Sequence, residues 1–200
     1  MSEIKKVLLI DTHLTYPNWT EGTLNGSFYT IAKDFFIAKS CEILETKIEK
    51  GYEIEDEVEK HLQADLVILQ TPVNWFGAPW IYKKYVDEVF NSALGSKKLL
   101  IGDGRSREDS SKQYGSGGNM QGRKFMICAT WNAPAEAFNN PAQNLLRGKD
   151  TSDLFLNITS NYRFCGYDIL PDYNCFDIYK GDEIKNDLEN YPIYLEKILS

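Results

Sequence analysis

Aromatic and amide side chains directly follow a short apolar run near the middle of the sequence, at residues 70–76 (QTPVNWF). The run itself, residues 65–69 (DLVIL), is typical of a central parallel strand that is covered on both faces. Open α/β sheets bind ligands beyond the carboxyl ends of their strands. Asn74, Trp75 and Phe76 are therefore placed to form a pocket for a planar cofactor, with flat apolar walls. The alternative is two ordinary core aromatics beside a turn, because cores use the same residue types.

A second candidate for chemistry is the polar loop of residues 11–25 (DTHLTYPNWTEGTLN), which leads from the first apolar run into a helical pattern. The loop places His13, Thr20 and Asn25 just before a helix amino terminus, where unpaired N–H groups and the helix dipole attract phosphate. It contains neither Gly-x-Gly-x-x-Gly nor Gly-x-x-x-x-Gly-Lys-Ser/Thr, so neither a dinucleotide fingerprint nor a P-loop applies. The alternative is a long surface loop with an ordinary Thr or Asn cap.

The loop at residues 130–134 (TWNAP) repeats the pattern of residues 70–76: a strand end, a tryptophan, an amide side chain and a proline. The carboxyl ends of parallel strands meet at one rim of a sheet, so the three loops are expected to converge. Two tryptophan-bearing loops at one rim favour a pocket over two unrelated core aromatics.

Other catalytic arrangements are poorly supported. Neither His13 nor His61 lies near a Gly-x-Ser-x-Gly turn, which argues against a nucleophile-and-base triad. The four cysteines form no Cys-x-x-Cys pair, so no zinc-ligand spacing is present and no metal site is predicted. Cys128 lies inside an expected central strand and is interpreted as a core residue. The carboxylates of residues 103–109 resemble a paired-carboxylate site, but their charged surroundings favour a solvated cluster.

Alternating strands and helices are predicted to position these loops. Strands are expected at residues 6–10, 41–48, 65–69, 124–130 and at the end of 168–178, with 99–101 as a candidate for a small extra strand. Helices are expected at residues 24–38, 55–62, 79–90, 153–164 and 182–199, the last with Asp182 as its cap. Such alternation means parallel βαβ units with right-handed crossovers. The predicted fold class is α/β: a doubly wound five-stranded parallel sheet with helices on both faces.

Length and charge narrow the class of protein further. Two hundred residues suit one domain, with residues 102–122 as an exposed excursion rich in glycine, serine and charge. A net charge of −7 argues against non-specific binding to nucleic acid or anionic membranes. The sequence has no signal-peptide layout and no apolar run near the roughly 18 residues of a membrane span. A cytoplasmic protein without membrane insertion is expected.

Several motifs resemble, in order and spacing, the modulator of drug activity B family. The matching pieces are Gly77-Ala78-Pro79-Trp80, residues 83–90 (KKYVDEVF), Asp103-Gly104-Arg105, residues 111–118 (SKQYGSGG), Gln121-Gly122 and residues 130–134. The match is close over residues 66–138 and looser over the remainder. This family belongs to the flavodoxin-like NAD(P)H:quinone oxidoreductases.

The resemblance implies an FAD-dependent homodimer that takes hydride from NADPH or NADH and passes two electrons to a quinone in a ping-pong cycle. By that resemblance the diphosphate would lie against residues 13–27. The flavin ring would meet residues 72–76 and 130–133, and Tyr114 would approach from the excursion. The implied cofactor-binding residues are His13, Thr20, Gly22, Leu24, Asn25, Pro72, Val73, Asn74, Trp75, Phe76, Tyr114, Thr130, Trp131, Asn132 and Ala133. The implied quinone-binding residues are Phe76, Tyr114, Gly117 and Gly118.

Departures from the family pattern leave the quinone preference open. The family motif after the third strand resembles Pro-Gly-Trp-Trp, whereas this chain has Pro72-Val73-Asn74-Trp75, so one wall is an amide. No histidine lies near the flavin from the fourth or fifth strand, so a Tyr/His proton relay cannot be carried over. No catalytic side chain is assigned, since the flavin carries the chemistry. The rival hypothesis is a flavodoxin-like regulatory or electron-carrier module that acts on a protein partner.

Overall fold

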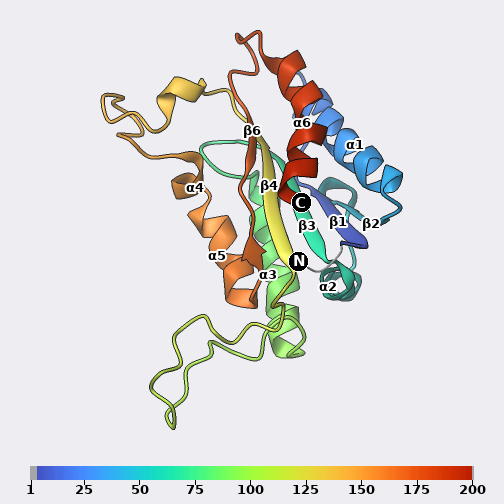
Figure 1. Cartoon of the computed structure of the whole chain (residues 1–200), viewed down its shortest axis with the longest axis vertical. Coiled ribbons are helices and arrows are strands. Elements are labelled where there is room, and N and C mark those ends of the chain that lie inside the picture. The colour runs from blue at the N-terminus through green and yellow to red at the C-terminus, as the bar shows by residue number, and fades with distance from the viewer. Residues whose placement is uncertain (1–3, 200) are drawn as a thin grey trace.

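A parallel β-sheet forms the centre of the computed structural model, which describes residues 4–199. The strands are β1 (Lys6–Asp11), β2 (Glu42–Lys47), β3 (Leu66–Pro72), β4 (Lys124–Thr130), β5 (Asp168–Ile169) and β6 (Tyr173–Cys175). Their order is β2-β1-β3-β4-β5, with β6 also paired to β4 and every pairing parallel (Figure 1). This topology, with helices on both faces, confirms the predicted doubly wound α/β sheet.

The fifth strand position is shared by two short strands. β5 pairs with the first residues of β4, β6 pairs with its last three, and residues 170–172 separate them. Pro171 lies in this gap, where a residue without an N–H group cannot continue the strand ladder. Residues 99–101 form no strand; Leu100 makes an isolated antiparallel bridge to Gly118 instead.

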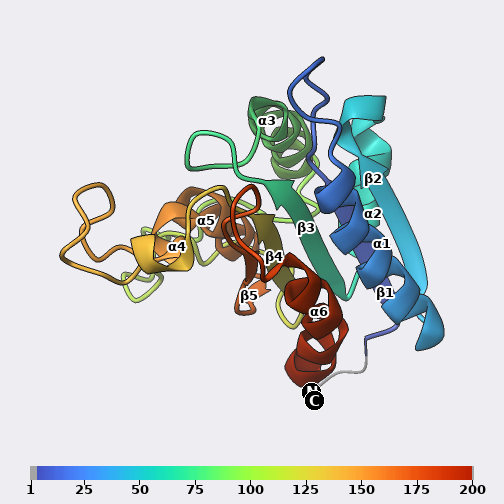
Figure 2. The same ribbon diagram turned by 90° about the horizontal axis from the view of Figure 1, so that it is seen from above.

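Helices cover both faces of the sheet. They are α1 (Thr23–Ala38), α2 (Ile54–Gln63), α3 (Trp80–Gly95), α4 (Thr151–Leu154), α5 (Leu156–Cys165) and α6 (Ile184–Leu199), with 3₁₀ turns at Ile48–Lys50 and Ala135–Ala137. α1 and α6 pack over one apolar cluster, and α2, α3 and α5 pack over the other (Figures 1 and 2). Two-sided cover explains why residues 66–69 of β3 and 125–129 of β4 are continuous apolar runs.

Three helix predictions differ from the structure at their boundaries. The helix expected at residues 79–90 continues to Gly95 as α3, and the buried Ala93 lies in the added part. The helix expected at residues 153–164 is divided at Phe155 into α4 and α5, and α4 begins with a capping box between Asp150 and Asp153. The last helix begins at Ile184, two residues after the predicted cap Asp182. Phe155 is completely buried against the core, so packing sets the break between α4 and α5.

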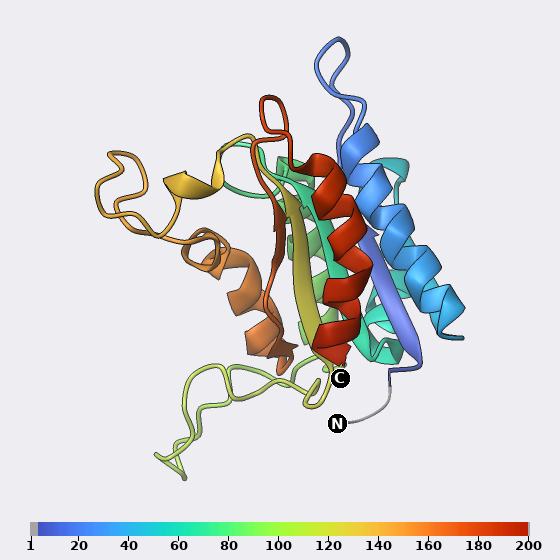
Figure 3. The same ribbon diagram turned by 45° about the horizontal axis from the view of Figure 1, so that its top comes forward.

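Residues 102–122 run between α3 and β4 without a helix or strand and extend away from the sheet (Figure 3). Their carboxylates have local partners: Asp103 pairs with Arg105, and Asp109 accepts hydrogen bonds from Ser111. Cys128 is fully buried in β4, as expected of a core residue. Within residues 4–199 no helix is long and apolar enough to cross a membrane, and no cluster of three potential metal ligands occurs.

Candidate functional site

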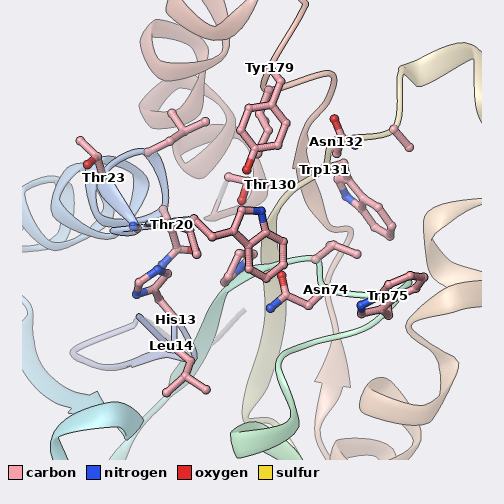
Figure 4. Close-up of a pocket in the computed structure, with 18 of the residues that line it drawn as sticks. His13, Leu14, Thr20, Thr23, Asn74, Trp75, Thr130, Trp131, Asn132 and Tyr179 are labelled. Atoms are coloured by element: carbon pink, nitrogen blue, oxygen red, sulfur yellow. Dashed lines mark hydrogen bonds between the residues drawn. The ribbon is translucent and has the colours of Figure 1, made fainter. Parts of the chain in front are cut away.

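A pocket of about 790 Å³ opens at the carboxyl ends of β1, β3 and β4. Its volume lies within the range of small-molecule and cofactor sites. Side chains from all three predicted loops surround it (Figure 4). The lining residues are His13, Leu14, Trp19, Thr20, Glu21, Gly22, Thr23, Leu24, Asn25, Pro72, Val73, Asn74, Trp75, Phe76, Thr130, Trp131, Asn132, Ala133, Leu145, Ile178 and Tyr179.

The loop after β1 forms one wall, and hydrogen bonds hold it in shape. Tyr16 and Thr20 pair their backbones across a narrow hairpin, with N–H to O distances of 3.2 and 3.1 Å. The carboxylate of Glu49 accepts the Thr15 N–H at 2.7 Å and the Thr15 hydroxyl at 3.1 Å. The Thr15 backbone N–H is the main reason that the pKa of Glu49 falls below its usual value. The loop is therefore tied to the Ile48–Lys50 turn beyond β2.

Helix α1 begins at the pocket wall after Gly22, which caps it with φ 74°. A Cβ atom at this position would lie 2.6 Å from three atoms of the His13 imidazole, so only glycine suits both the backbone and the space. The His13 Nε2 atom is buried and has no hydrogen-bond partner in the described chain. No acidic residue occupies the first turn of α1. This corner combines free helix N–H groups, the positive end of a dipole and an unpaired imidazole nitrogen, a suitable set for an anion.

A tight turn after β3 presents two aromatic side chains. Asn74 and Gly77 exchange backbone hydrogen bonds of 2.8 and 3.2 Å, and the residues between them have positive φ, 50° for Trp75 and 67° for Phe76. Consecutive positive φ angles define a type I′ turn, in which Asn-Gly is the favoured pair. Trp75 is 91% exposed and Phe76 43% exposed. These two residues are not core aromatics, the alternative raised by the sequence.

Trp131, in the loop after β4, differs from Trp75 in its packing. Its side chain is 2% exposed and packs against Phe138 and Phe155, with ring centroids 5.0 and 5.1 Å away. The indole Nε1 donates to Asn174 Oδ1 at 2.7 Å. Trp131 is therefore a buried residue that packs beneath the pocket wall, whereas the next residue, Asn132, is exposed at the edge of the pocket.

Asn25 also faces inward. Its side chain is 3% exposed, donates to Asp11 and accepts a hydrogen bond from Gln70. Its amide is therefore occupied within the protein, so Asn25 contributes to the pocket through the backbone of α1.

Three predicted site residues lie away from this pocket in the single chain. Tyr114 packs on Phe164 of α5 with ring centroids 5.2 Å apart, near the amino end of β4. A Cβ atom on Gly117 would lie 2.2 Å from Gly102 O, and one on Gly118 would lie 2.1 Å from Cys165 C. Both glycines thus permit close backbone packing at the base of the excursion. The other predicted site residues all line the pocket.

The pocket also includes residues that the sequence analysis did not identify. Ile178 and Tyr179 follow β6, so the rule that placed the other loops at this rim could have found them. Leu145 comes from a loop pinned by an Asn139 N–H to Lys149 O bond, and its sequence carries no comparable signal.

Comparison with known proteins agrees with this architecture. The model of a family with a flavodoxin-like fold matches residues 5–198. NADPH:quinone oxidoreductase MdaB from Haemophilus influenzae is 36% identical over 96% of this chain and 98% of its own. An uncharacterized protein from Schizosaccharomyces pombe is 35% identical over 90% of this chain and 89% of its own.

Solved structures share the fold at lower identity. A Klebsiella pneumoniae protein described as a candidate quinone reductase has a TM-score of 0.77 at 22% identity, covering 96% of this chain and 84% of its own. General stress protein 14 from Treponema denticola, in complex with FMN, has a TM-score of 0.67 at 15% identity, covering 97% and 99%. Both the family model and the Haemophilus relative span almost the whole sequence. The chain therefore belongs to the modulator of drug activity B family within the flavodoxin-like fold.

Proposed function

We propose that this protein is an FAD-dependent NAD(P)H:quinone oxidoreductase that reduces quinones by two electrons in a ping-pong cycle. The observation that carries the proposal is one pocket with an anion-binding helix terminus on one side and an exposed aromatic turn on the other. The name and the 36% identity of the Haemophilus relative support the same reaction and a reduced nicotinamide, NADPH or NADH, as electron donor.

The residues of the pocket fit a flavin. The phosphates would lie at the α1 terminus, beside the free His13 nitrogen and the hydroxyl groups of Thr20 and Thr23. Gly22 has no side chain and therefore lets the His13 ring lie directly against the start of α1. Trp75 and Phe76 would cover a flat ring with apolar surface and exclude water from it. A bound flavin would supply the two-electron chemistry, while the protein binds, orients and shields it.

FAD rather than FMN is the proposed cofactor because the family pattern implies it and because the long loop at residues 11–25 lines the same pocket as the aromatic turn. The alternative cofactor is FMN, which is bound in the structure of the Treponema protein. Cofactor released from the purified protein by heat and separated by chromatography decides between them. Recovery of FMN alone, or failure to bind either flavin on reconstitution, would reject the FAD assignment.

Turnover separates the enzyme from a carrier protein. The proposal expects flavin-dependent oxidation of NADPH or NADH with a free quinone, and initial-rate patterns of the ping-pong type. Bound flavin with negligible turnover and tight association with a protein partner would instead favour the regulatory or electron-carrier module.

A symmetric homodimer in the cytoplasm is the proposed working form. Tyr114, Gly117 and Gly118 lie at the opposite end of the sheet from the pocket of their own chain. A second copy could bring its excursion to this pocket, and interfaces commonly build such sites. Light scattering that finds a fully active monomer at the assay concentration would reject the dimer.

A further inference from the structure

A chain of buried and half-buried polar side chains lies beneath the pocket. Asp11 Oδ1 accepts the His13 N–H at 3.0 Å and the Asn25 side-chain N–H at 2.8 Å. Asn25 Oδ1 in turn accepts from Gln70 Nε2 at 3.0 Å. The chain of contacts thus links the ends of β1 and β3 to the first turn of α1.

Gln70 occupies a position that the strand pattern reserves for an apolar side chain. Leu66 and Ile68, at the alternate positions before it in β3, belong to the apolar cluster beneath α1 and α6. Gln70 is 1% exposed, and its Oε1 has no hydrogen-bond partner in the described chain. A buried polar atom without a partner costs about 1–3 kcal/mol. This cost indicates that the amide serves another purpose than core stability.

The geometry points to Gln70 as a positioning residue for the phosphate-binding corner of the pocket. Gln70 touches no pocket surface itself; it acts through Asn25, whose backbone belongs to the first turn of α1. Asp11 and Gln70 are register partners in β1 and β3, so the relay starts from a rigid base. Asp11 also holds the backbone of His13 on the other side of the same corner. Fixing both sides in advance lowers the ordering cost when an anion binds.

This inference rests on the proposed flavin site, and it makes a selective prediction. Riboflavin lacks phosphate, whereas FMN and FAD carry one and two. Gln70→Met keeps the length of the side chain and removes the hydrogen bond to Asn25. Loss of one such bond corresponds to about a five- to tenfold rise in Kd. We expect that rise for FMN and FAD, with the Kd for riboflavin changed by less than about twofold.

The experiment measures the Kd of all three flavins by quenching of flavin fluorescence, for the parent, Gln70→Met and Ile68→Val. Ile68 lies two residues before Gln70 in β3 and is equally buried, but its side chain forms no hydrogen bond, so its variant controls for general loosening of the core. Gln70→Asn, which keeps the amide, provides a second variant if Gln70→Met does not fold. We expect it to show the same selectivity, because its shorter side chain no longer reaches Asn25.

The outcomes are distinct. Selective weakening of FMN and FAD in the Gln70 variant alone supports the positioning role. Equal weakening of riboflavin, or the same selectivity in Ile68→Val, would overturn it. A parent protein that binds none of the three flavins rejects the proposed function itself, whatever the variants do.

Discussion

Replacing Trp75 by asparagine should stabilise the ligand-free protein while it weakens flavin binding. Trp75 has φ 50° in a type I′ turn, where an ordinary side chain costs about 1–2 kcal/mol and asparagine is among the best tolerated. Because its side chain is 91% exposed, the substitution removes little buried surface, worth about 0.5 kcal/mol. The expected net gain in the free energy of unfolding is therefore about 0.5–1.5 kcal/mol.

Flavin affinity should change in the opposite direction. Loss of a flat aromatic wall is worth on the order of 1 kcal/mol, or roughly a several-fold rise in Kd. Trp75→Phe keeps both the ring and the strained backbone, so it should retain parental stability and most of the flavin affinity. Trp75→Ala keeps the strain and loses the ring, so it should weaken flavin retention or quinone turnover without the gain in stability.

Urea denaturation of the ligand-free parent and its three Trp75 variants tests the predicted gain in stability. Flavin titration of the same four proteins tests the predicted loss of affinity. A Trp75→Asn protein less stable than the parent would refute the strain argument. If the Ala and Phe variants both match the parent in flavin affinity and quinone turnover, Trp75 does not form the pocket wall.

Three further changes follow from the structure. Gly22→Ala should raise the flavin Kd more than about tenfold, because its Cβ atom would lie 2.6 Å from the His13 ring. A Cβ atom at Gly26, in the helix that follows, meets nothing within 4 Å, so Gly26→Ala should leave the Kd unchanged in the same titration. Glu57→Gln should lower the free energy of unfolding in urea by about 3 kcal/mol, because this buried carboxylate pairs with Lys60 at 2.6 Å and accepts hydrogen bonds from Thr46 and Tyr85. Glu59→Gln breaks only an exposed ion pair with Lys98 and should lower it by less than about 1 kcal/mol. Equal losses in the two variants would contradict this prediction. Burial raises the pKa of Asp172 from 3.8 to about 7. Between these two values the folded protein keeps a proton that the unfolded chain has released. The contribution of Asp172 to the free energy of unfolding therefore falls as the pH rises from about 4 to about 7. Asp172→Asn should remove that slope and stabilise the protein at pH 8 by about 2 kcal/mol more than at pH 4, measured by urea unfolding at both values; an unchanged pH profile would show that the carboxyl titrates normally.

Local pattern and the parallel topology together determined much of the site. The strand at residues 124–130 was predicted with its observed bounds, because a short apolar run between polar flanks has one stable place in a sheet covered on both faces. Parallel strands bring their carboxyl ends to one rim, and the loops after β1, β3 and β4 therefore met in one pocket as the sequence predicted. Both inferences depend on spacing along the chain, which the sequence contains.

Tertiary packing alone decided how individual side chains are used. Trp75 and Trp131 both lie in loops that follow neighbouring strands, yet one is exposed on a strained turn and the other is buried with its indole N–H bound to Asn174. Likewise, the sequence at residues 70–76 predicts a pocket only through its aromatic and amide residues after the strand, and only the approach of α1 gives the Gln70 amide a partner. Burial and hydrogen bonding depend on which distant segments arrive beside a residue, and those contacts form only when helices and sheet pack together.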